Sequence, residues 1–405
     1  IGAWVAKKHN LTHYWHVHEI IETPKFLHST ISWLMQKTSH KIICVSKAVE
    51  DHWIQGNSNL AQKTIHIYNG IEPIEKSTKA NYRDTYHIPT NAIVIGMAGR
   101  VHYWKGQDYF LAIAQQLLTL EALKNSSLPK EHTNNSSTLH IPPFYFLITG
   151  DAFPGNEYLV NEIQDFIEKN KLSHRIFYTG FEAQMDTFYS AIDILVLPSL
   201  QPDPLPTVVL EAMQYGIPVA ATPQGGALEM IVDNETGIFI PMHDKSEAAA
   251  HIFHLAHTLQ QKESGNITAF ENRKMMGEKS KQRVAQYFSK QAFEQNIISL
   301  LNLPIKNKPL KVSIIGARGY PYVYSGYETL VKQIGERMVT QGVEVKVYCH
   351  AYLFKEQPPQ VNGIQLKYIP TLKSKSLSQP IHSFLAFWHA AFSKADVLLV
   401  LNVSN

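Results

Sequence analysis

The sequence lacks the features that mark disulfide-rich, membrane-spanning or nucleic-acid-binding proteins. Only two of its 405 residues are cysteines, too few for a disulfide framework. Cys44 and Cys349 lie far apart, each in an apolar run, which favours buried thiols over a bridge or a metal site. No stretch of about 18 apolar residues occurs, which excludes a membrane-spanning helix. The net charge of +3 is too small to indicate a nucleic-acid partner.

A dinucleotide-binding fingerprint is also missing. No Gly-x-Gly-x-x-Gly follows the first strand of any predicted module, which argues against a Rossmann oxidoreductase. Hydrophobic residues make up 44% and charged residues 18% of the chain, a balance typical of a globular protein rather than a disordered one. The length predicts two or three domains. Because the chain begins at Ile1 and ends at Asn405 directly after an apolar run, both ends are expected to lie inside a longer protein.

Apolar runs rich in β-branched residues alternate with amphipathic stretches along the whole chain. Strand, helix and strand at this spacing predict an α/β fold with doubly wound parallel sheets covered on both faces. Helices are expected at Gln107–Leu120, Glu157–Asn170 and Val208–Tyr215. The predicted strands are Thr12–Val17, Lys41–Val45, Thr64–Tyr68, Ala92–Ala98, Phe144–Thr149, Ile176–Thr179, Ile194–Pro198, Pro218–Ala221, Lys311–Ile315, Val343–Cys349 and Val397–Leu401.

Three shifts in composition predict the domain boundaries. A polar stretch at 71–91 is typical of a linker, 121–143 of a surface insertion, and 302–310 of a second linker. Residues 311–405 hold ten Lys and Arg against five Asp and Glu, for which a solvated face is favoured over an anionic membrane surface. The predicted division is 1–75, 76–91 as linker, 92–285, 286–310 as closing helix and linker, and 311–405.

The first motif that carries chemistry follows the predicted strand at Ala92–Ala98. It begins with Gly99-Arg100 and ends with Lys105-Gly106. Glycine lets a backbone approach a ligand closely. Two cations at the carboxyl end of a strand can neutralise a diphosphate, the arginine as a bidentate donor and the lysine as a point charge. Either cation alone would more often be a surface residue.

The second motif follows the predicted strand at Ile194–Pro198. Pro206 suits the first turn of a helix, and that helix would direct its positive N-terminal end toward an anion. Asp203 lies in the loop before it and Glu211 about one turn inside it. One acid can face a reacting sugar while the other accepts hydrogen bonds from ribose hydroxyls. Gly225-Gly226 forms a further turn at the same crevice.

These residues resemble the donor signature of retaining GT-B glycosyltransferases, the group called family 4 or "glycosyl transferases group 1". The match includes Gly99-Arg100, Lys105-Gly106, Glu211-Ala212-Met213 and Gly216–Val219. Asp203 departs from the pattern, which usually has glutamate there. Further similarities at Trp15–Glu19, Ile42–Lys47, Ile67–Ile71, Ile148–Asp151 and Tyr178–Phe181 follow in the expected order, so the resemblance spans roughly residues 1–300.

The resemblance implies transfer of a sugar from a nucleotide diphosphate donor to a glycan or lipid-linked acceptor, with retention. Arg100, Lys105 and the helix N-terminus would stabilise the leaving phosphate. No Asp-x-Asp motif follows a strand, so no metal and no cofactor are expected. His16 or His18 would contact the sugar; the choice stays open, since both lie on one face of a strand. The implied donor-binding residues are Gly99, Gly150, Gly180, Phe181, Leu205, Pro206, Thr207, Gly225 and Gly226.

Residues 311–405 resemble the opening of another N-terminal domain of this superfamily, of the rhamnosyltransferase-like branch. The similarity rests on the turns at Gly316–Gly319 and Ser325-Gly326. Two accounts fit this order: a fragment of a tandem enzyme, which is favoured, or a circular permutation in which 311–405 and 1–70 complete one domain. The second account predicts Lys311–Ile315 and Thr12–Val17 in one sheet.

Two functions therefore remain open. The first is a cytoplasmic glycosyltransferase of polysaccharide assembly, with peripheral association at the inner membrane face and no nucleic-acid partner. The second is a catalytically incomplete donor-binding or scaffold module. Both bind a nucleotide sugar, but only the first turns it over.

Overall fold

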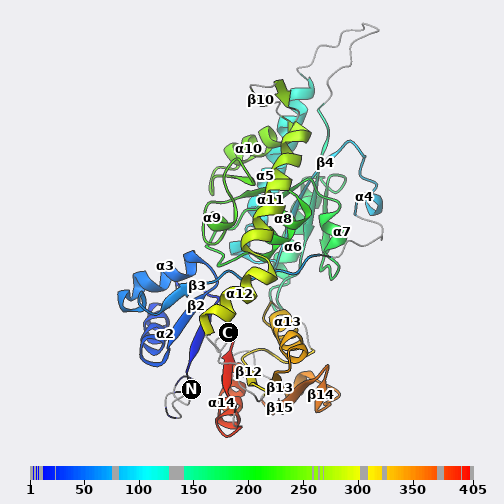
Figure 1. Ribbon diagram of the computed structural model, residues 1–405. Helices are drawn as coiled ribbons and strands as arrows, with labels where there is room; N and C mark the ends of the chain where they lie inside the picture. Colours follow the sequence, from blue (N-terminus) through cyan, green and yellow to red (C-terminus); the bar gives the residue numbers. More distant parts are fainter. Residues whose placement is uncertain are drawn as a thin grey trace. The chain divides into compact units, whose positions relative to one another are not determined.

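The computed structural model describes most of the chain, and by its internal packing the chain divides into two units. One unit spans Tyr68–Ile297, and the other joins Ile1–Ile67 to Ile298–Asn405 (Figure 1). The described residues are 3, 6, 8, 12–22, 24–74, 82–126, 141–257, 260–262, 265–267, 269–301, 309–321, 326–371, 378–393 and 395–401.

Six parallel strands organise the unit Tyr68–Ile297. Their order is β6-β5-β4-β7-β8-β9, so the chain leaves the centre at β4, builds one half of the sheet, and returns at β7 to build the other. This order places a switch point between β4 and β7, where the loops after both strands open onto one crevice. The strands are β4 (Ile93–Ala98), β5 (Phe144–Thr149), β6 (Ile176–Gly180), β7 (Ile194–Leu197), β8 (Val219–Ala221) and β9 (Gly237–Phe239).

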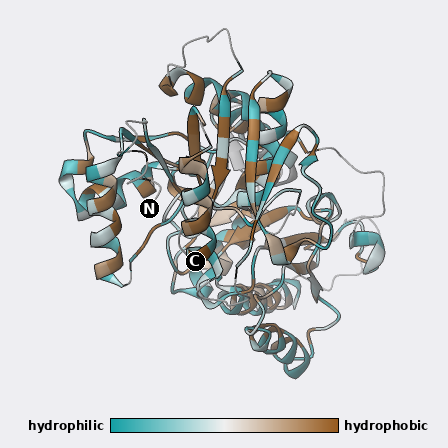
Figure 2. Ribbon diagram, turned by 90° about the horizontal axis from the view of Figure 1, so that it is seen from below, coloured by the Kyte–Doolittle hydropathy of each residue, from teal (hydrophilic) through white to brown (hydrophobic). Residues whose placement is uncertain are grey.

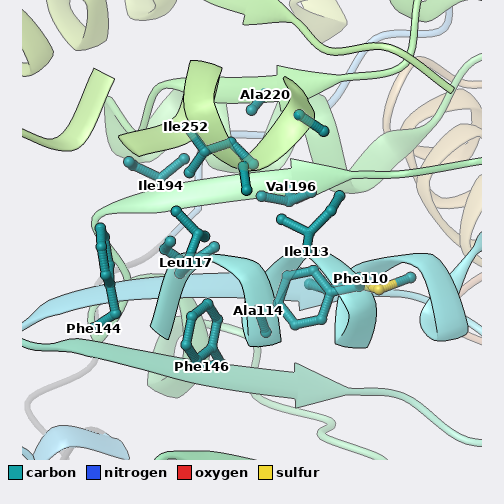
Figure 3. Packing of buried hydrophobic residues seen from close by; sticks show 14 of the residues in the cluster. Phe110, Ile113, Ala114, Leu117, Phe144, Phe146, Ile194, Val196, Ala220 and Ile252 are labelled. Atoms are coloured by element: carbon teal, nitrogen blue, oxygen red, sulfur yellow. The ribbon is translucent and has the colours of Figure 1, made fainter. Parts of the chain in front are cut away.

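The core of this sheet is apolar because its central strands are covered on both faces. Every residue of β4 and β7 is buried, as expected for parallel strands between helices. Brown, hydrophobic residues dominate the strands in Figure 2. The packing of helix α5 and its neighbours against β5, β7 and β8 is shown in Figure 3, with Phe110, Ile113, Ala114, Leu117, Phe144, Phe146, Ile194, Val196, Ala220 and Ile252 labelled.

Helices connect the strands and cover the sheet. Helix α8 is followed by Gly216, whose φ of 74° suits the left-handed conformation common after a helix. The helices of this unit are α4 (Tyr82–Thr85), α5 (Gln107–Ser126), α6 (Tyr158–Lys169), α7 (Asp186–Tyr189), α8 (Thr207–Tyr215), α9 (Ala227–Met230), α10 (Lys245–His257), α11 (Ala269–Tyr287) and α12 (Lys290–Leu301), the last of which crosses the unit boundary, and β10 (Gln260–Lys262) and β11 (Gly265–Ile267) form a small hairpin.

Part of the predicted linker is packed onto this unit. Residues 75–81 and most of the predicted insertion, 127–140, lie outside the described residues. Within α4, Arg83 bonds Asp193 at 2.6 Å, and Tyr82 donates its hydroxyl to Glu182 at 2.7 Å. The start of the sheet is therefore tied to the segment that precedes it.

The N-terminal segment forms a three-stranded parallel sheet. Strand β1 (Tyr14–Val17) pairs with β2 (Lys41–Cys44), which pairs with β3 (Thr64–His66). Helices α2 (Lys25–Thr38) and α3 (Lys47–Gly56) connect these strands. The Ser46 side chain accepts from the backbone N–H of Val49 and caps α3.

The C-terminal segment forms a five-stranded sheet of order β14-β15-β13-β12-β16. Helix α13 (Gly326–Thr340) follows β12, and α14 (Ser378–Ala391) precedes β16. The strands are β12 (Lys311–Ile315), β13 (Glu344–His350), β14 (Gln360–Val361), β15 (Ile364–Ile369) and β16 (Val397–Val400).

The two strands that the permutation account places in one sheet do not pair: β12 belongs to the five-stranded sheet and β1 to the three-stranded one. Strand β16, which pairs with β12, however contacts β1. The two segments nevertheless share one unit. The predicted burial of Cys44 and Cys349 as free thiols is confirmed.

Candidate donor site

Three glycines line the carboxyl edge of the six-stranded sheet. Gly99, Gly150 and Gly180 follow or end β4, β5 and β6, and each has a positive φ. The Gly150 N–H donates to the Gly180 carbonyl at 2.8 Å. A Cβ on Gly99 or Gly180 would meet nothing within 4 Å, whereas one on Gly150 would lie 1.9 Å from the Gly99 oxygen. The edge is thus tightly packed at Gly150, whereas there is open space beside Gly99 and Gly180.

Arg100 lies directly beside this edge and is exposed. Its guanidinium carbon lies 3.7 Å from the centre of the Phe153 ring, a cation–π contact that holds the planar cation by its face. The Arg100 carbonyl accepts from the Gln107 side-chain amide at 2.9 Å. Phe153 therefore holds the Arg100 side chain, and Gln107 holds its backbone.

Lys105 and Asp203 form an ion pair across the switch point. The side chains are only 19% and 12% exposed, so the pair is shielded from solvent more than an ordinary surface bridge. The Lys105 ammonium also lies 4.2 Å from the centre of the Trp104 ring. The loop after β4 and the loop after β7 thus place one cation and one carboxylate in direct contact.

The backbones of the loop after β4 and the loop after β7 are also in direct contact. Leu200 donates its N–H to the Trp104 carbonyl at 2.7 Å. Gly106 has a φ of 79°, and a Cβ there would lie 2.1 Å from the Pro198 oxygen. A side chain at position 106 would force the loops apart and separate Lys105 from Asp203.

The loop that carries Asp203 also packs against the turn after β8. The Gly226 N–H donates to the Asp203 carbonyl at 2.8 Å. A Cβ on Gly225 or Gly226 would come within 2.4 Å of the backbone oxygens of Asp203 or Pro204. Beyond this contact, buried Leu205 leads into Pro206 and Thr207, where α8 begins and its positive end faces this edge.

Glu211 lies inside α8 and has a different partner from Asp203. The Tyr189 hydroxyl donates to the Glu211 carboxylate at 2.6 Å. Burial raises the pKa of Glu211, and the Tyr189 hydrogen bond opposes that rise. The two acids therefore differ in chemistry: Asp203 is balanced by a cation, and Glu211 is held by a neutral phenol.

His16 and His18 lie in the other unit, on and just after β1. Nδ1 of His16 and Nε2 of His18 are 3.3 Å apart, which confirms that the two side chains share a face. Burial lowers the pKa of His16 to about 4 and also lowers that of His18. Both imidazoles are therefore neutral near pH 7 and can bond a hydroxyl without adding charge.

Tyr327 from α13 lies against this pair. Its ring centre is 5.2 Å from that of His18, and its hydroxyl donates to Glu19 at 3.0 Å. Burial, with Glu19 nearby, raises the pKa of Tyr327. Tyr327 was not predicted from the sequence, because no local pattern relates it to Glu19, 308 positions earlier.

The structure therefore brings together most of the predicted donor-site residues on one sheet edge. Phe181 follows Gly180 and is 75% exposed, as a residue that stacks on a flat ligand would be. Sequence reasoning missed Gln107, Phe153, Trp104 and Tyr189. Among the described residues, no cluster of His, Cys, Asp and Glu is suited to hold a metal ion.

Comparison with known proteins identifies the family. The family described as "Glycosyl transferases group 1" matches residues 78–283, half of the chain. This chain belongs to that family. Among curated relatives, it is 27% identical over 225 residues to an uncharacterized glycosyltransferase of Methanocaldococcus jannaschii, covering 53% of this chain and 50% of that protein. It is 26% identical to the O-antigen biosynthesis glycosyltransferase WclY of Escherichia coli over 182 residues, covering 44% and 42%.

The chain thus spans about half the length of these curated relatives. Solved structures of GT-B glycosyltransferases show the same fold. The structure of HepE of Anabaena in complex with UDP has a TM-score of 0.61 and 22% identity, over 74% of this chain and 75% of that one. The sucrose-phosphate synthase of Thermosynechococcus elongatus has a TM-score of 0.57 and 19% identity, over 74% and 70%. The α/β, GT-B type fold expected from the sequence is confirmed.

Proposed function

We propose that the unit Tyr68–Ile297 binds a nucleotide diphosphate sugar and that the chain transfers its sugar with retention. The observation that carries this proposal is the contact between Lys105 and Asp203 at the switch point of the sheet. The substrate carries an anionic phosphate beside a sugar that becomes positively charged during transfer. The Lys105 ammonium can stabilise the phosphate, and the Asp203 carboxylate can stabilise the sugar. Among solved relatives, HepE has been captured with UDP-glucose, which supports this ligand class.

Each step of the proposed reaction has a residue to assist it. The bond between the anomeric carbon and the phosphate oxygen breaks, and negative charge grows on that phosphate. Arg100, Lys105 and the first turn of α8 stabilise the charge without a metal ion. The acceptor oxygen attacks from the face that the phosphate leaves, and its proton passes to the leaving phosphate oxygen. Asp203 faces the developing positive charge on the sugar.

The remaining donor contacts follow from the same geometry. Glu211 accepts from the ribose hydroxyls, Phe181 lies along the base, and the open space above Gly99 and Gly180 takes the diphosphate. We assign His16 and His18 to hydroxyls of the transferred sugar, as neutral partners. The acceptor is proposed to be a glycan or a lipid-linked saccharide, used in the cytoplasm at the inner membrane face. No helix in the described ranges has the length and apolar character needed to span a bilayer.

The domain division remains part of the proposal. Residues 92–285 form the donor half, 1–75 belong to an acceptor-side domain, and 311–405 open a second, rhamnosyltransferase-like domain of a tandem protein. The separate sheets that contain β1 and β12 support this division. The single unit formed by residues 1–67 and 298–405, in which β1 contacts β16, supports the permutation instead.

Turnover of a panel of nucleotide sugars by the purified chain tests the function. We expect one donor to release nucleoside diphosphate and to raise the unfolding temperature, with and without EDTA. Glu211→Ala should abolish both effects. Arg337→Ala, in α13 of the other unit, is the matched control and should change neither.

The second candidate is a donor-binding module without turnover. The observation that favours it is that the chain spans only half of its curated relatives. In that case the same panel would show a thermal shift with no release of nucleoside diphosphate.

A further inference from the structure

We propose that the outer face of α14 is a docking surface for an anionic lipid bilayer. The proposal goes beyond the transfer reaction and does not depend on it. It rests on an apolar helix face that the C-terminal segment leaves uncovered, and on the charge of the sheet face beside it.

The outer face of α14 is made of large apolar side chains. Phe384 and Trp388 of α14, and Phe392 directly after its last residue, follow one another at intervals of four residues and are 46%, 63% and 71% exposed. Leu385 is exposed beside them. The ring centres of Phe384 and Trp388 are 6.4 Å apart, and those of Trp388 and Phe392 are 5.9 Å apart. They form one continuous stripe, not isolated exposed residues.

The opposite face of the same helix packs against the five-stranded sheet. Ala386, Phe387 and Ala390 are buried in a cluster with Ile315 of β12 and Tyr348 of β13. A helix that is apolar on both sides needs two partners. The sheet is the first of them, and it fixes the helix so that the aromatic stripe points outward. No Asp, Glu, Lys or Arg occurs between residues 378 and 391.

The sheet face beside α14 carries positive charge. Lys346 of β13 and Lys367 of β15 lie on the face that also bears Tyr348, because Tyr348 is aligned with Lys367 in the parallel pair. Both lysines lie near His389 of α14, whose pKa is lowered by burial and further by these two cations. Two acids, Glu344 and Asp396, lie at the start of this face beside Lys311, which pairs with Glu344 at 3.2 Å and donates its backbone N–H to Asp396 at 3.0 Å, so three lysines face two acids. The net charge next to the stripe is therefore positive.

These features favour a lipid surface over a second copy of the chain. Aromatic side chains flanked by cations suit the boundary between acyl chains and anionic headgroups. Two copies joined through this face would bring Lys346 and Lys367 toward their own counterparts. The helix has 14 residues, too short to cross a bilayer, so it would lie in the plane of the interface.

Sedimentation of the full chain with vesicles tests the proposal. We expect binding to vesicles of phosphatidylcholine with phosphatidylglycerol, weaker binding to phosphatidylcholine alone, and a decrease at high salt. Trp388→Ser with Phe392→Ser should weaken binding about tenfold or more, because the two exposed aromatic side chains that would enter the bilayer interface are lost. Lys346→Glu with Lys367→Glu should weaken binding to the anionic vesicles alone.

Phe26→Ser with Trp33→Ser is the matched control, since both residues are exposed aromatics on α2. This variant should bind vesicles like the unchanged chain. The proposal is overturned if the unchanged chain does not sediment with anionic vesicles, or if the α14 and α2 variants bind equally. A dimer that the α14 variant converts to a monomer, without vesicle binding, would instead assign the face to a second copy. The thermal shift caused by nucleotide sugars is measured separately, without vesicles. It tests the donor site alone, so a failure of the membrane proposal can be told from a failure of the proposed function.

Discussion

Lys105 donates a hydrogen bond to the carboxylate of Asp203, 98 residues further along the chain. The contact joins the loop after β4 to the loop before α8. It places the cation proposed for the leaving phosphate beside the acid proposed for the sugar. Each side chain holds the other in position before a donor arrives.

Replacing Lys105 with methionine should remove one electrostatic contact to the leaving phosphate. We expect kcat/KM for the donor to fall by about 10²–10³-fold, the usual cost of losing one preorganised charge donor. Steady-state release of nucleoside diphosphate measures this effect. Lys105→Arg should retain part of the activity.

The double variant Lys105→Met with Asp203→Asn separates catalysis from stability. Lys105→Met alone leaves the Asp203 carboxylate without its cation and should lower the unfolding temperature. The double variant should recover that temperature but not the activity. Recovery of activity as well would mean that Lys105 serves only to neutralise Asp203.

Tyr189→Phe should change the pH dependence of donor binding. The Tyr189 hydroxyl lowers the pKa of Glu211, which burial raises, so its removal raises that pKa further. If ionised Glu211 holds the ribose, affinity is present above its pKa and lost as pH falls through it. In Tyr189→Phe this loss should therefore occur at a higher pH.

Titration of donor affinity by calorimetry over a range of pH values measures that shift. Tyr215→Phe is the control, because the Tyr215 hydroxyl bonds Asp186 rather than Glu211. Equal pH profiles for the unchanged chain and Tyr189→Phe would remove Glu211 from the ribose site.

Alanine at Gly150 and at Gly180 should have unequal effects. Both glycines have a positive φ, but only at Gly150 would the new Cβ overlap another atom, the Gly99 oxygen. Gly180→Ala should cost about 1 kcal/mol for the left-handed backbone, a decrease of about 2–4 °C in unfolding temperature. Gly150→Ala should cost several times more. Calorimetric unfolding compares them, and equal decreases would show that the edge can widen.

Acid should destabilise the C-terminal sheet through a buried pair of histidines. His350 and His382 stack with ring centres 3.8 Å apart, and burial is the main cause that lowers their pKa values to about 4 and about 3. Their neutral forms are favoured in the fold, so stability is complete above the unfolded pKa of about 6.5 and decreases below it.

Each histidine should contribute a loss of about 1.4 kcal/mol per pH unit below that value, until its folded pKa is reached. Urea unfolding at about pH 7.5 and about pH 5, followed by hydrogen exchange of α14, measures the loss. His382→Phe should make stability less dependent on pH. An unchanged dependence would mean that the pair is protonated or open in solution.

The sequence predicted the elements of the donor unit closely because its strands are buried on both faces. Phe144–Thr149 was predicted with the bounds that the structure has, and so was Lys311–Ile315 in the other unit. Strand β15 (Ile364–Ile369) was missed, although polar side chains alternate with its buried ones, the period typical of a half-buried strand. Strand β9 was also missed, because it has only three residues and starts at a glycine.

The site was predicted in part for a related reason. Arg100, Lys105, Asp203 and Glu211 belong to local motifs with a fixed spacing, so the chain order alone pointed to them. Phe153 contacts Arg100, and Tyr189 donates to Glu211, only in the folded chain. Their roles depend on how strands pack, which no local pattern contains. The roles of all six residues in catalysis remain predictions.

The close approach of Gly106 to Pro198 has a consequence for how this site can change. A side chain at 106 would push against a carbonyl of the neighbouring loop, so the segments 104–106 and 198–203 behave as a single mechanical part. Alterations of donor preference that reshape one segment must be accommodated by the other. A library directed at new sugars would therefore be most productive if it varied both segments jointly and left Gly106 untouched.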